Sequence, residues 1–152
     1  MKENKEVINH NSIHILMAED DPDDRMLTKE AFEENLIQNR IDFVEDGEEL
    51  LQFLRKEGKF ADMPTPGLIL LDLNMPKKDG REALKEIKSD PVFRRIPIIV
   101  LTTSKAEEDI VKTYDLGVNS FISKPVTFDD LVRVTKEIGR YWFELVELPK
   151  DK

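Results

Sequence analysis

The sequence contains no cysteine, so disulfide bonds, thiolate nucleophiles and cysteine metal ligands are excluded. It also has no apolar run long enough to span a bilayer. Residues 1–11 are polar and lack the apolar core of a secretory signal. These absences predict a cytoplasmic protein without a membrane partner. The length of 152 residues is that of about one domain, enough to bury a core without covalent staples.

Positive charge is scarce, because 23 Lys and Arg residues face 32 Asp and Glu residues, for a net charge of −9. No basic stripe offsets this charge, which would repel a phosphate backbone. Nucleic acid is therefore not an expected partner. Most of the carboxylates are interpreted as a solvated surface that keeps the protein soluble.

Short apolar segments alternate with helical patterns along the chain. Strands are expected over 13–18, 40–44, 68–72, 96–102 and 120–123. Helices are expected from Pro22, Gly47, Asp79, Ser104 and Thr127. This alternation predicts an α/β fold, in which right-handed crossovers build a doubly wound parallel sheet with helices on both faces.

Finer local features are also predicted. Asp21 and Thr127 are expected to cap helices, and Ser104 with Glu107 forms a capping box. The first helix is expected to bury Met26, Leu27, Ala31, Phe32 and Leu36, and the last to bury Phe128, Leu131, Val134, Ile138, Trp142 and Leu145. Further apolar surface is expected from Tyr141, Phe143, Val146 and Leu148. The domain is expected to span 13–148, between a flexible tail of 1–12 and a tail of 149–152.

One stretch, 68–80, organises the chemistry of the chain. An unbroken apolar run ends at Asp72 and is followed at once by a turn rich in proline, lysine, aspartate and glycine. Such a run is typical of a strand buried on both faces. Asp72 then lies at the carboxyl edge of the sheet, where open α/β folds bind their ligands.

Other polar residues end the neighbouring strands. Glu19 and Asp20 follow the first strand, Thr102 ends the fourth and Lys124 follows the fifth. If the first and third strands are neighbours, three carboxylates converge, and an oxygen-only cluster of this kind suits Mg²⁺. Lys124 would supply a compact positive charge and Thr102 a hydroxyl donor to a transferring phosphoryl group. Asp72 is therefore predicted to be a nucleophile that becomes an aspartyl phosphate.

With these residues in view, the sequence resembles the receiver domain of two-component response regulators over about 13–145. The resemblance rests on Glu19-Asp20, on Asp72 with Gly80 beyond, on Thr102 and on Lys124-Pro125. It implies a flavodoxin-like (βα)5 fold with strand order 2-1-3-4-5. It also implies that Asp72 takes a phosphoryl group from a phosphohistidine, and that the chain is a switch rather than an enzyme.

The resemblance assigns roles at the metal. Asp20 and Asp72 would bind Mg²⁺ through their side chains, and Asn74 would contribute its backbone carbonyl. Glu19 would hold a metal-bound water, although aspartate is commoner in the family at this position. Thr103 stands where many members have a smaller residue, and the lifetime of the aspartyl phosphate is left open.

The resemblance also assigns the switch. Thr102 and Phe121 would form the switch pair, and Lys124 would grip the phosphoryl group. The Lys124–Pro125 bond is cis in the family.

Within the family the chain looks most like the single-domain, phytochrome-associated regulators, on the long loop over 56–67 and the ending around Trp142. This narrower likeness implies a sensor histidine kinase, phytochrome-like, or a phosphotransfer protein as partner. It also implies a homodimer through the helix over 104–116, the strand over 120–123 and the helix over 127–145.

Two other functions compete with this one. A phosphohydrolase of the haloacid-dehalogenase type needs a second aspartate two positions after its nucleophile, where this chain has Asn74. A flavodoxin-like cofactor binder would hold phosphate after the first strand, where the carboxylates of this chain would repel it. Asp21, Asp23 and Asp24 are interpreted as first-turn charges that favour a helix dipole, outside the site.

Overall fold

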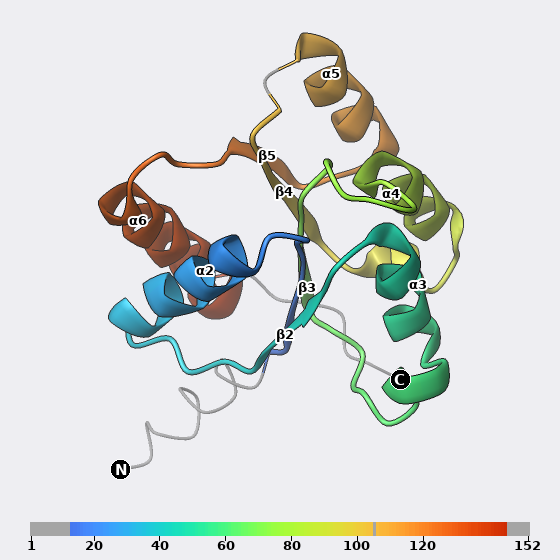
Figure 1. The fold of residues 1–152 in the computed structure, drawn as a ribbon, viewed down its shortest axis with the longest axis horizontal. Helices are drawn as coiled ribbons and strands as arrows, with labels where there is room; N and C mark the ends of the chain where they lie inside the picture. Colours follow the sequence, from blue (N-terminus) through green and yellow to red (C-terminus); the bar gives the residue numbers. More distant parts are fainter. Residues whose placement is uncertain (1–12, 105, 146–152) are drawn as a thin grey trace.

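The computed structural model describes residues 13–104 and 106–145, and strands and helices alternate along them (Figure 1). The strands are β1 (Ile15–Ala18), β2 (Ile41–Val44), β3 (Leu68–Leu71), β4 (Ile98–Thr102) and β5 (Ser120–Ser123). The helices are α2 (Pro22–Glu34), α3 (Gly47–Arg55), α4 (Gly80–Ser89), α5 (Glu107–Leu116) and α6 (Phe128–Gly139), which continues as a π-helical segment over Arg140–Leu145. No helix within these residues is long and apolar enough to cross a bilayer.

The five strands form one parallel sheet in the order β2-β1-β3-β4-β5, which confirms the predicted fold. In the register of the central strands, Ala18 of β1 lies opposite Leu71 of β3. The residues that follow these two strands therefore emerge side by side at the carboxyl edge.

The three central strands, β1, β3 and β4, are buried on both faces because their alternate side chains enter two different cores. In β1, Leu16 and Ala18 face the core covered by α3 and α4, while Ile15 and Met17 face the core covered by α2 and α6. Figure 1 shows these helices on opposite sides of the sheet. This two-sided burial explains why the strands are apolar runs rather than alternating patterns.

Two predicted helix caps are confirmed and one is wrong. The side chain of Asp21 accepts a hydrogen bond from the Asp23 amide, and that of Thr127 from the Asp130 amide. Before α5, however, the N-cap is Ala106, without a side-chain hydrogen bond. The Ser104 hydroxyl instead donates to Asp109 Oδ2, in the first turn of α5, at 2.6 Å, and this contact replaces the predicted capping box.

The predicted apolar face of α2 is only partly correct. Ala31 and Phe32 are buried, but Met26 and Leu27 are 55% and 41% exposed, and Leu36 is 84% exposed. Leu36 lies beyond the end of α2 with φ of 60°, so the helical spacing no longer applies to it. Met26 and Leu27 lie in the half of α2 near the carboxyl edge of the sheet, and this exposure leaves apolar surface there.

The C-terminal helix also differs in detail from its prediction. Phe128 is exposed rather than buried, because it is the first residue of α6, at the edge of the layer. Phe143, predicted to add surface, is buried in the core between α6 and the sheet. The side chain of Leu145, the residues Val146 and Leu148, and both predicted tails lie outside the described residues.

Gly80 brings α4 against the backbone that carries Asp72. A Cβ at this position would overlap the Asp72 carbonyl oxygen and lie 2.7 Å from Leu73 Cα. The Gly80 amide instead donates to the Leu73 carbonyl at 3.0 Å. Because any larger residue would have to displace backbone, Gly80 fixes the turn after β3.

Candidate functional site

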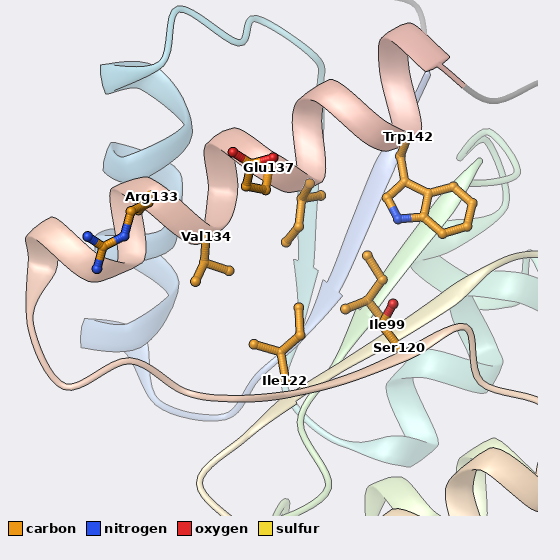
Figure 2. A pocket seen from close by; sticks show the side chains of 8 residues that line it. Ile99, Ser120, Ile122, Arg133, Val134, Glu137 and Trp142 are labelled. Carbon is orange, nitrogen blue, oxygen red and sulfur yellow. The ribbon is translucent and has the colours of Figure 1, made fainter.

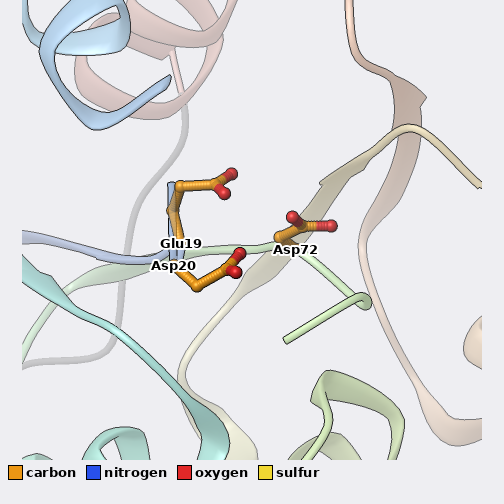
Figure 3. Close-up of side chains that lie close together, drawn as sticks. All are labelled: Glu19, Asp20 and Asp72. Atoms are coloured by element: carbon orange, nitrogen blue, oxygen red, sulfur yellow. The ribbon is translucent and has the colours of Figure 1, made fainter. Parts of the chain in front are cut away.

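The carboxyl edge of the sheet gathers three acidic side chains from two neighbouring strands. Glu19 and Asp20 follow β1, and Asp72 follows β3. One oxygen from each carboxylate lies within 4.8 Å of the others. Figure 3 shows Glu19 and Asp20 reaching from the end of β1 toward the side of Asp72. The convergence predicted from the order of the strands is therefore present.

Lys124 places an ammonium group among carboxylates. Its Nζ lies 2.6 Å from Glu19 Oε1, 2.8 Å from Asp24 Oδ2 and 3.4 Å from Asp72 Oδ2. The amide of Lys124 also donates to the Thr102 carbonyl at 2.8 Å, which ties the end of β5 to the end of β4. The lysine is thus held at both its backbone and its side chain.

The two oxygens of Asp72 have different neighbours. Oδ1 accepts hydrogen bonds from the Thr102 hydroxyl at 2.7 Å and from the backbone amide of Asn74 at 3.2 Å. Oδ2 faces the Lys124 ammonium. Asp72 is 5% exposed and Thr102 is fully buried, so these donors act with little competition from water.

Burial and charge perturb the ionisable groups of this edge. Burial, together with the nearby Asp72, raises the pKa of Glu19 to about 7, although the Lys124 ammonium opposes the shift. Burial alone would lower the pKa of Lys124, but the carboxylates of Asp24 and Glu19 outweigh burial and raise it. Carboxylates outnumber the ammonium here, so the site has an excess of negative charge that a further cation would relieve.

The donor set fits a hard divalent cation. The cluster of Glu19, Asp20 and Asp72 offers only carboxylate oxygens, and Asp20 is exposed while the other two are buried. Mg²⁺ takes oxygen ligands and keeps several waters, so it needs few protein ligands and one open side. The sequence contains no cysteine, and no histidine joins the cluster among the described residues, so the softer ligands that favour zinc are not supplied there.

Some contacts of the site were not predicted. Asp24, interpreted from sequence as a helix-dipole charge, contacts Lys124, and the Arg25 guanidinium donates to the Glu19 carbonyl at 2.7 Å. Asp24 lies in the first turn of α2, which brings it back over the end of β1. Its place in the first turn of the helix that directly follows Glu19 is the signal that could have identified it.

The remaining predicted residues have mixed outcomes. Phe121 is half-buried against the core that α3 and α4 cover, and its amide donates to the Tyr114 hydroxyl at 3.1 Å. The described residues contain no cis peptide bond, so the expectation for Lys124–Pro125 is wrong. The trans form is the one generally favoured for an X–Pro bond, by about 0.5–1 kcal/mol.

Comparison with known proteins defines the class. Residues 15–136 match the response regulator receiver domain family, so the chain belongs to this family. The family supports a phosphoacceptor response regulator in two-component signalling, and it does not support the phosphohydrolase alternative.

Particular relatives are similar over almost the whole chain. Response regulator Rcp1 of Synechocystis sp. is 42% identical over 135 residues, which are 89% of this chain and 92% of Rcp1. The phosphorylated cyanobacterial phytochrome response regulator RcpA is 44% identical with a TM-score of 0.86, over 91% of this chain and 99% of RcpA. The Mn²⁺-bound form of Rcp1 is 41% identical with a TM-score of 0.84, over 91% of this chain and 99% of the Rcp1 chain.

The acidic cluster predicts opposite effects of Asp20→Asn with and without metal. In EDTA the variant should be at least as stable as the wild type, because one of three repelling carboxylates is neutralised. With Mg²⁺ at 100 times the dissociation constant, the wild type should gain about 2.7 kcal/mol of unfolding free energy, and the variant much less. Urea denaturation measures both.

Asp23→Asn is the matched control, because Asp23 is an exposed carboxylate of α2 outside the cluster. It should keep the full Mg²⁺ effect. Equal stabilisation of the wild type and Asp20→Asn by Mg²⁺ would contradict a metal site in this cluster.

Proposed function

We propose that this response regulator accepts a phosphoryl group on Asp72 in a Mg²⁺-dependent reaction. The observation that carries the proposal is the environment of one carboxylate, which has Lys124 and Thr102 on its own oxygens and two further carboxylates beside it. Two relatives support it, since RcpA is known in a phosphorylated form and Rcp1 in a Mn²⁺-bound form.

The residues divide the work of the transfer. An Asp72 oxygen attacks phosphorus, the O–P bond forms, and the N–P bond of a donor phosphohistidine breaks with its electron pair returning to the imidazole. The Lys124 ammonium and the Thr102 hydroxyl are placed to stabilise the equatorial oxygens. Mg²⁺, held by Asp20, Asp72 and the Asn74 carbonyl with Glu19 on a bound water, would neutralise the charge of the phosphoryl oxygens.

The same geometry supports a switch rather than turnover. Asn74 occupies the position where a phosphohydrolase has an acidic proton donor. The side-chain amide of Asn74 cannot give up a proton at neutral pH. Thr102 and Phe121 are the proposed switch pair, through which phosphorylation shifts the population of conformers on the α5, β5 and α6 surface. We propose that the chain works in the cytoplasm and acts on no substrate beyond its own carboxylate.

An apolar surface of this chain lies beside the site, where a phosphodonor protein could dock. A cavity of about 110 Å³ opens next to Lys124, between α2 and the start of α6. Three apolar side chains of its lining are exposed: Leu27, Val126 and Phe128. We propose that a sensor histidine kinase, phytochrome-like, or a phosphotransfer protein docks here, which would bring its phosphohistidine to Asp72.

A second copy of the chain would bind at a different surface. A groove of about 490 Å³ lies between α6 and strands β4 and β5. Figure 2 shows Ile99, Ile122 and Trp142 along it. Arg133 and Glu137 stand on its rim, four residues apart on α6. In a two-fold dimer each arginine would face the glutamate of the other copy, so we propose a homodimer through this groove.

Incubation with acetyl phosphate and Mg²⁺ should add one phosphoryl mass, measured by intact-protein mass spectrometry. Asp72→Ala should abolish the addition, because the nucleophile is gone. Lys124→Ala should slow it by about 10²-fold or more, because a stabilising donor is lost. Lys77→Ala, which removes an exposed lysine of the nearby turn, should leave the rate unchanged. Phosphorylation of the Asp72→Ala variant would contradict the proposal.

Val126→Ser should separate docking from chemistry. Val126 is 97% exposed, so the substitution costs no packing, but it removes apolar surface beside Lys124. Transfer from a phosphorylated histidine-kinase domain should fall about tenfold, roughly the factor for 1.4 kcal/mol of lost contact, while labelling by acetyl phosphate is unchanged. The control is Val111→Ser, an exposed valine on α5. Equal effects of the two variants would contradict docking at Val126.

Charge reversal at the groove tests the dimer. Glu137→Arg should shift the phosphorylated protein toward monomer in sedimentation velocity, because two cations would then face each other across the two-fold axis. Arg133→Glu combined with Glu137→Arg should restore the dimer. Both side chains are exposed, so neither change disturbs the core. A wild-type protein that stays monomeric after phosphorylation would refute this interface.

A further inference from the structure

Arg81 joins the first turn of α4 to the first turn of α5 through a two-point contact. Its Nε donates to Asp109 Oδ1 at 2.8 Å, and its Nη2 donates to Asp109 Oδ2 at 2.7 Å. The Asp109 side chain is 12% exposed, so the pair is shielded on that side. A guanidinium held at two points resists rotation and translation together, unlike a single ionic contact.

The same guanidinium reaches the turn that follows Asp72. Nη1 lies 3.4 Å from the Leu73 carbonyl, and Nη2 lies 3.4 Å from Asn74 Oδ1. These contacts are long, whereas Nη1 donates to Asp79 Oδ2 at 2.9 Å. Arg81 therefore touches both the phosphoacceptor turn and α5, and its firmest contacts are with the two aspartates.

Ser104 connects Asp109 to the residue that touches the phosphoacceptor. Its hydroxyl donates to Asp109 Oδ2 at 2.6 Å, and its amide donates to Thr102 Oγ1 at 3.4 Å. The Thr102 hydroxyl in turn donates to Asp72 Oδ1 at 2.7 Å. A continuous set of contacts thus leaves Asp72 through Thr102 and returns to its turn through Arg81.

The pair is fully charged in the folded protein at neutral pH. Hydrogen bonds from Arg81 and Ser104 lower the pKa of Asp109 to about 2. The hydrogen bond to Asp109 raises the pKa of Arg81 in return. The ion pair and both of its hydrogen bonds therefore have to break if α5 moves away from α4.

We propose that the Arg81–Asp109 pair is a restraint that holds α5 and residues 102–104 in their unphosphorylated position. This rests on the proposed function of Asp72. The Thr102 hydroxyl already donates to the free carboxylate, so it has to move to follow the oxygens of a phosphoryl group. Ser104 is two residues away and is held by Asp109, which Arg81 holds. Thr102 therefore moves only when Asp109 moves with it or releases Ser104.

A restraint of this kind has a defined thermodynamic consequence. It stabilises the unphosphorylated arrangement and not the phosphorylated one, so it weakens the affinity of Asp72 for any phosphoryl group or analogue. Loss of the restraint should tighten that affinity. Arg81 and Asp109 are thus positioning residues, which act on Asp72 through Ser104, Thr102 and the turn.

Beryllofluoride with Mg²⁺ is the probe, because it mimics a phosphoryl group on a carboxylate. Asp109→Asn should lower its dissociation constant at least fivefold, and Arg81→Gln should do the same from the other side of the pair. The double variant should bind no more tightly than either single variant, because all three break the same Arg81–Asp109 pair.

Asp79→Asn is the matched control. It neutralises the other aspartate that contacts Arg81 and makes no contact with α5, and asparagine also caps helices well. Its affinity for beryllofluoride should stay within twofold of the wild type. Tightening by Asp79→Asn equal to that by Asp109→Asn would overturn the proposal, since loss of charge alone would explain both.

A purely structural pair would behave differently. It would lower the melting temperature of Asp109→Asn and Arg81→Gln without changing the beryllofluoride affinity, and that result would also overturn the proposal. The Phe121 amide, bonded to Tyr114 of α5, is a second reporter by NMR. Its resonance in free Asp109→Asn should lie closer to the bound position than in the free wild type. A wild-type protein that binds no beryllofluoride would refute the function proposed for Asp72 and the restraint with it.

Discussion

The contact between the Lys124 ammonium and its surrounding carboxylates is the interaction on which the site depends. Glu19 is almost fully buried, and a buried carboxylate without a partner is costly. Removing one member of such a buried pair costs about 3–5 kcal/mol. Because the ammonium follows β5 and the carboxylates come from α2 and the ends of β1 and β3, the site exists only when these elements have come together. Folding and function therefore share one set of charges.

The geometry of the site follows from two backbone constraints. The parallel register that sets Ala18 opposite Leu71 delivers the acidic residues at one level. The close approach of Gly80 then fixes the turn after β3, so Asp72 is held by its own backbone as well as by its hydrogen bonds. A nucleophile held this way loses little freedom when it reacts.

Much of this arrangement was predictable from the sequence, for a simple reason. Parallel strands end at one edge of a sheet, so residues that end apolar runs meet there whatever lies between them in the sequence. Glu19, Asp20, Asp72, Thr102 and Lys124 were predicted on this basis, and the structure brings them together. The predicted roles of these five residues, of Phe121 and of the Asn74 carbonyl stay predictions.

Features set by one helix against another were less predictable. Helical spacing assigned Met26, Leu27 and Leu36 to the core, but spacing alone does not say where a covering element ends. Asp24 was interpreted as a local dipole charge, and Ser104 as a local cap, because both explanations need only neighbouring residues. In the structure Asp24 bonds to Lys124, and Ser104 bonds to Asp109 instead of acting as the cap.

The amino-acid sequence is sufficient to specify the class of fold, the order in which strands and helices alternate, and the residues at the ends of the strands. Apolar runs, turns and periodicity are local properties, and they are sufficient for these features. The pairing of polar side chains, as of Arg81 with Asp109 and of Lys124 with Asp24, becomes clear only from the folded chain. Long charged side chains have several partners within reach of their backbone position, and the packing of the helices selects one of them.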